Sequence, residues 1–82
     1  MRVIGEIPDA RCKITLFAWN NRYLLKFERG LLEQTFKVNE FDVTSEQELR
    51  QIVDDAFIEA VIKQFDLMEN NLSESMKRNH IG

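Results

Sequence analysis

The chain has 82 residues and a formal net charge of −3, which is enough length for one domain and too little for a second core. Its single cysteine, Cys12, excludes an intramolecular disulfide, and Cys12 with the single histidine, His80, cannot supply the roughly four ligands that a zinc site needs. The acidic balance argues against broad binding to a phosphate backbone, so nucleic acid is not the expected partner.

The first half of the chain, residues 2–39, alternates apolar and polar side chains, as β-strands do. The first strand is expected at Arg2–Ile7, because Pro8 ends the run. A four-residue loop after this strand would place Val3 on the core face and Ile4 on the opposite face.

Asn20-Asn21 is expected to be the loop of a hairpin, because asparagine tolerates the positive φ that a two-residue hairpin turn requires. With this loop Lys13 faces Glu28, and apolar residues face one another. One face of the hairpin is then almost wholly apolar: Ile14, Leu16, Ala18, Tyr23, Leu25 and Phe27.

The next turn is expected at Arg29-Gly30, with the glycine supplying positive φ. This turn would place Lys26 opposite Glu33. The four strands would then form an antiparallel meander in sequence order.

Two residues on the core face differ from their apolar neighbours. Gln34 is expected at an edge position with its amide in solvent, and a buried ligand contact is the alternative. Cys12 is expected to be a small core hydrophobe. A reactive thiol there would need a nearby cation or helix N-terminus.

A capping signal at residues 44–48 starts the helical half, because Thr44 and Ser45 each have a Gln or Glu three positions later. The helical pattern lasts to Leu72. Residues 1–72 are therefore expected to form one α+β domain, and the polar residues 73–82 a flexible tail.

The apolar positions up to Ala56 and those from Phe57 onward form two groups. At about 100° per residue, the two groups point in directions roughly 150° apart, so one straight helix cannot turn both toward one sheet. Either the helix breaks near Asp54–Phe57, with Asp54 or Asp55 capping a second helix, or it continues and buries two sides. In the continuous case one helix face would meet another chain.

The residues that could carry chemistry do not form a catalytic set. The densest acidic group, Asp54, Asp55 and Glu59, lacks the looped spacing of a calcium site and is expected to be a solvated helix face or cap. No histidine is placed to activate a serine, and no P-loop or Rossmann fingerprint is present. We therefore expect no enzyme activity, no cofactor and no bound metal.

The sequence also bears on where the protein is found. No apolar run approaches the roughly 20 residues of a membrane span. The N-terminus lacks the apolar stretch of a signal peptide. With one free thiol, these features favour a cytoplasmic protein that does not enter a membrane.

The stretch GEIPDARCKITLFAWNNRYLLKFERGLLEQTFK, residues 5–37, resembles a family of small uncharacterised bacterial proteins in its order of strand residues and turns. The resemblance implies a small cytoplasmic bacterial protein. The matching residues contain no catalytic motif, so no functional residue is inferred from the resemblance.

These patterns predict an α+β layer fold: a four-stranded antiparallel meander with one long or broken C-terminal helix on one face. The other sheet face would meet water although part of it is apolar, which indicates a protein-binding surface and a homodimer. The alternatives are a small nucleic-acid-binding or regulatory protein and, third, a small-ligand binder near Gln34. The residues expected at the interface are Ile4, Phe17, Trp19, Arg22, Leu24 and Leu31.

Overall fold

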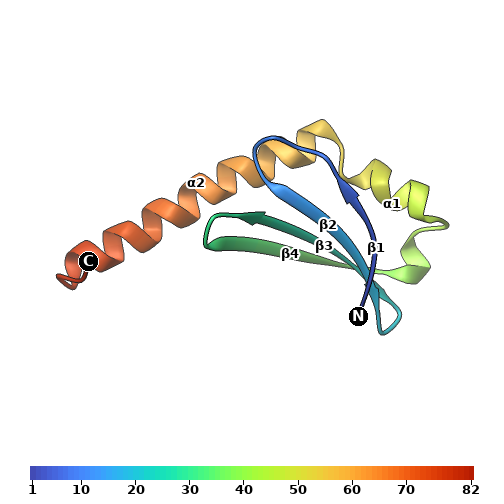
Figure 1. Cartoon of the computed structure of the whole chain (residues 1–82), viewed down its shortest axis with the longest axis horizontal. Coiled ribbons are helices and arrows are strands. Elements are labelled where there is room, and N and C mark those ends of the chain that lie inside the picture. The colour runs from blue at the N-terminus through green and yellow to red at the C-terminus, as the bar shows by residue number, and fades with distance from the viewer.

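The computed structural model describes all 82 residues and confirms the α+β fold (Figure 1). The four strands form one antiparallel sheet in the order β1-β2-β3-β4, with the long C-terminal helix packed on one face. The other face carries no helix, and we call it the helix-free face. The elements are β1 (Arg2–Ile7), β2 (Lys13–Trp19), β3 (Arg22–Arg29), β4 (Leu32–Asn39), the 3-10 turn η1 (Glu40–Asp42), α1 (Glu46–Ile52) and α2 (Asp55–Arg78).

The β2–β3 hairpin has the predicted loop and register. Asn20 and Asn21 have φ angles of 54° and 63°, as a turn with two left-handed residues requires. Lys13 pairs with Glu28. The predicted apolar face is the face that packs on the helices, because its central residues belong to the buried core.

The turn between β3 and β4 is Gly30-Leu31, so the prediction of Arg29-Gly30 was wrong. Gly30 has a φ of 59° at the first loop position, where a two-residue turn of type II′ needs glycine. The true register pairs Arg29 with Leu32 and Lys26 with Thr35, two residues away from the predicted one. A shift of two residues leaves every side chain on its predicted face.

A β-bulge in β1 reverses the predicted faces of Val3 and Ile4. The register with β2 shifts between Val3 and Gly5, so Val3 pairs with Phe17 on the helix-free face. Ile4 instead packs against the core. A bulge adds one residue to a strand, and residues before it change face.

The core lies between the sheet and the helices, with Phe27 and Phe65 fully buried at its centre. The Phe27 ring meets the rings of Phe36 and Phe57 edge-on, at centroid distances of 5.8 and 5.5 Å. Edge-on contacts of this kind are favourable arrangements of aromatic rings. The buried core residues are Cys12, Ile14, Leu16, Leu25, Phe27, Leu49, Val53, Ile58, Val61 and Phe65.

The helical half breaks at Val53, which decides between the two alternatives for residues 54–57. Val53 has a φ of −85° and a ψ of 66°, outside the helical range, and ends α1. Asp54 then caps α2, because its side chain accepts a hydrogen bond of 2.8 Å from the backbone N–H of Phe57. The break lets Leu49 of α1 and Val61 of α2 both reach the one core.

Helix α2 continues past the sheet to Arg78, so residues 73–78 of the predicted flexible polar tail are helical (Figure 1). It ends in a Schellman motif: the N–H of Ile81 donates to the carbonyl of Met76 at 2.9 Å, and His80 has a φ of 55°. The motif closes the helix without the glycine that usually marks such an end.

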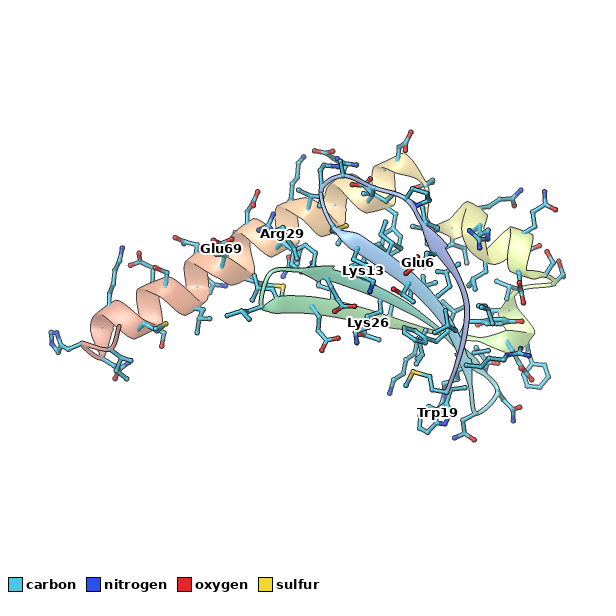
Figure 2. The ribbon with its side chains drawn as sticks, in the orientation of Figure 1. Glu6, Lys13, Trp19, Lys26, Arg29 and Glu69 are labelled. Atoms are coloured by element: carbon cyan, nitrogen blue, oxygen red, sulfur yellow. The ribbon has the colours of Figure 1, made fainter.

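Arg29 ties the β3–β4 hairpin to α2. Its guanidinium donates to Asp66 and to Glu69, each at 3.1 Å, and lies over the ring of Phe65 at 5.1 Å from the centroid. Figure 2 shows Arg29 and Glu69 turned toward one another. The contact fixes the hairpin tip where the helix leaves the sheet.

Candidate functional site: the helix-free face and the open edge of the sheet

Four of the six residues predicted at an interface lie together on the helix-free face. Phe17 and Leu24 are direct cross-strand partners there, and Trp19 pairs with Arg22. Trp19 is 48 % exposed, whereas Leu24 is only 6 % exposed. The apolar surface that this face offers therefore comes mainly from Trp19 and from Val3, which sequence patterning did not place here, with a smaller part from the half-buried Phe17.

The other two predicted residues lie elsewhere. Ile4 belongs to the opposite face, because the bulge turns its side chain to the core. Leu31 sits in the β3–β4 turn with its side chain fully exposed, next to a shallow hollow shared with Leu72 of α2. The predicted surface is thus smaller than the sequence indicated.

Charged side chains cover the centre of the helix-free face. The Nζ atom of Lys26 lies 3.5 Å from a carboxylate oxygen of Glu33 and 4.0 Å from one of Glu28, so two carboxylates offset the charge of Lys26. Figure 2 shows Lys26, Lys13 and Glu6 on the side of the sheet away from α2. Arg22 pairs with Trp19 across the hairpin but does not form a cation–π contact with it. The one cation–π contact in the structure is between Arg29 and Phe65.

Thr15 is a buried polar residue in the middle of this charged surface. It pairs with Lys26 on one side and with Glu6 on the other, and it is 5 % exposed. Its hydroxyl oxygen has no hydrogen-bond partner. A buried hydroxyl without a partner lowers stability, because it has lost its bonds to water.

Changing Thr15 to valine is therefore expected to raise the free energy of unfolding by about 1 kcal/mol. Valine has nearly the same shape and needs no hydrogen bond. Urea unfolding measures the change, with Thr35→Val as a control on the same face, where the hydroxyl is exposed. A loss of stability in Thr15→Val would mean that the hydroxyl is hydrogen-bonded in solution.

A groove runs between the edge strand β4 and α2, with a volume of about 560 Å³. Phe36 is 37 % exposed along it. None of its lining residues is charged, although 30 % of the chain is charged. The lining residues are Gln34, Thr35, Phe36, Phe57, Ala60, Val61, Gln64 and Met68.

Gln34 has a different role from either alternative considered for it. Its amide nitrogen donates to the backbone carbonyl of Val61 at 3.0 Å, so it joins β4 to α2 along the groove. The part of the groove that α2 supplies was missed by sequence analysis. The sequence indicated that Phe57 and Met68 are apolar residues of the helix. It could not show that they lie beside β4, because this depends on how the helix crosses the sheet.

The β1–β2 loop holds the other large hollow, and half of the residues that line it are charged. Arg11 donates to Asp9 at 3.0 Å and to Glu59 of α2 at 2.8 Å. The hydrogen bonds from Arg11 hold the pKa of the Asp9 carboxyl below its usual value. Burial raises the pKa of the Cys12 thiol, so this thiol is poorly suited to act as a nucleophile. The loop thus connects the sheet to α2.

No three His, Cys, Asp or Glu side chains lie close enough together to hold a metal ion. None of the helices combines the length and the apolar content needed to cross a membrane.

A scan against protein-family models finds no match. Searches of the curated proteins and of the solved structures find no match either. The resemblance to small bacterial proteins therefore stays a prediction.

Proposed function

We propose that this chain is a non-catalytic protein-interaction module that associates with itself. The observation that supports the proposal is the groove beside β4, which is uncharged and partly apolar on a chain otherwise rich in charge. Charged residues are depleted and aromatic residues enriched at the centre of protein interfaces. Two aromatic side chains, Phe36 and Phe57, line this groove and meet edge-on, with their ring centroids 5.0 Å apart.

The size of the domain supports the same proposal. A single core in a chain of 82 residues is marginal, and burying apolar surface against a second subunit is a common form of support. The single free thiol, Cys12, fits a cytoplasmic setting for this association.

The helix-free face is a second surface that a partner can use. Trp19 is half exposed at the end of the sheet that lies away from the projecting part of α2, and the exposed Val3 lies on the same face opposite Phe17. Tryptophan is a frequent anchor residue at interfaces. Because Trp19 is the only tryptophan, its fluorescence reports on this face alone.

We expect the molar mass of the protein to rise above 9.7 kDa as its concentration is raised from the low to the high micromolar range. Sedimentation equilibrium measures this mass. Ala60→Glu adds a charge to the groove and is expected to keep the protein monomeric. Ala56→Glu is the matched control, since Ala56 is also exposed on α2 but does not line the groove.

Emission from Trp19 distinguishes the two surfaces in the same samples. Association through the groove leaves its maximum unchanged, whereas association through the helix-free face shifts it to shorter wavelength. A mass of 9.7 kDa at every concentration would contradict self-association.

A further inference from the structure

We infer that two copies pair antiparallel along the free edges of their β4 strands, with Thr35 facing the partner's Thr35. This inference rests on the proposed self-association and states which residues meet. It follows from three features of β4: a long regular edge, the direction of its free backbone groups, and the order of its charges.

The sheet has two edges, and β1 carries two features that block pairing, a bulge and a neighbouring proline, which β4 lacks. β1 has a bulge between Val3 and Gly5 and is followed by Pro8. β4 is eight residues long, pairs with β3 without a bulge, and contains no proline or glycine. Long regular edges of this kind are templates for pairing with another chain.

The free backbone groups of β4 belong to its odd-numbered residues. In a two-residue hairpin the residues that flank the loop, here Arg29 and Leu32, are bonded to each other. Bonded pairs then alternate along the ladder. At the other end of β4 the N–H of Glu40 donates to the carbonyl of Asn21 at 3.2 Å, which fits the same alternation.

The even-numbered residues of β4 are therefore bonded to β3. Glu33, Thr35 and Lys37 direct their N–H and C=O groups away from the sheet, and all three are exposed. A partner strand must meet these three residues with its own outward groups.

The charges of Glu33 and Lys37 favour one register for the pairing of the two β4 strands. With Thr35 opposite the partner's Thr35, Glu33 lies opposite the partner's Lys37, and the symmetry of the pair makes this contact twice. Opposite charges and paired threonines are favourable cross-strand neighbours. Centring the pair on Glu33 or on Lys37 would instead place like charges together, and centring it on Gln34 or Phe36 would leave the charges opposite neutral residues.

The same register covers the groove. Gln34 of one copy would lie opposite the partner's Phe36 on the face that carries α2, so the two grooves meet at the symmetry axis. The α2 residues nearest to the groove rim include Ala60 and Gln64, which are exposed and uncharged. Both copies thus bury apolar groove surface without burying a charge.

Charge exchange tests the register. Lys37→Glu places Glu33 opposite a second glutamate and is expected to raise the dimer dissociation constant about tenfold. Glu33→Lys is expected to do the same. The double variant Glu33→Lys with Lys37→Glu restores opposite charges across the pair and should recover most of the lost affinity, although it breaks the exposed Lys26–Glu33 ion pair within each monomer. Lys63→Glu is the control for net charge, because Lys63 is exposed on α2 away from the groove.

Thr35→Pro tests the backbone pairing separately. Because the N–H of Thr35 points away from β3, proline there removes no bond within the monomer, and edge strands tolerate it. The variant should stay folded by circular dichroism and lose the dimer.

The outcomes separate this inference from the proposed function. A wild type that is monomeric throughout would overturn both. A dimer that Lys37→Glu and Thr35→Pro leave unchanged would overturn pairing along β4 while self-association stands. A double variant as weak as the single variants would overturn the Glu33–Lys37 register.

Discussion

Replacing Phe27 by alanine is expected to lower the free energy of unfolding by about 3–5 kcal/mol. Phe27 lies in the middle of β3 with no exposed surface, and its ring touches those of Phe36 and Phe57. Alanine would leave a cavity and remove both edge-on ring contacts, which carry about 0.5–1.5 kcal/mol beyond burial in such pairs. Because small domains are stable by only about 5–15 kcal/mol, the variant should be close to unfolding.

Urea unfolding followed by circular dichroism measures this loss. Phe41→Ala is the matched control, because Phe41 is 83 % exposed and its removal should change stability by less than about 0.5 kcal/mol. Equal losses in the two variants would mean that the core is not centred on β3.

Replacing Leu49 by alanine is expected to cost about 2–5 kcal/mol. Leu49 is the buried residue of α1, which has seven residues and cannot be stable without tertiary contacts. Removing it should therefore release α1 from the sheet as well as open a cavity. Hydrogen exchange of the α1 amides should become faster than that of the α2 amides beside Phe65.

Ile52→Ala provides the comparison for Leu49. Ile52 lies in the same short helix, keeps 38 % of its surface exposed, and should cost much less on replacement. If α1 amides remain as protected in Leu49→Ala as in the wild type, the helix is held by something other than Leu49.

Local signals in the sequence predicted the elements and the core well. The β2–β3 register followed from Asn20-Asn21, because two adjacent asparagines leave one position for the turn. At Arg29–Leu31 a single glycine fits either loop position, so the register could not be decided. The core was still correct, because the two registers differ by two residues and side-chain direction repeats with that period.

Other features depend on geometry that composition does not reveal. Val3 and Ile4 are adjacent and both apolar, so alternation could not decide which of them faces the core, and the one signal of a bulge was the glycine at position 5. The helix end at His80 uses a left-handed residue that is not glycine and so gave no signal. The groove beside β4 exists only because α2 crosses the sheet at that edge.

The meander order also affects how quickly the protein reaches this fold. Every strand pairs with the strand that precedes or follows it in the chain, so each pairing closes only a short loop. Closing short loops costs little chain entropy, and domains dominated by such contacts fold faster than those with distant pairings. The main long-range step left is the docking of α2, where Arg29 contacts residues of the helix 37 and 40 positions away. The sheet can thus assemble by local zippering before the helix covers it, and β4 can meet a second copy only after its own hairpin has formed.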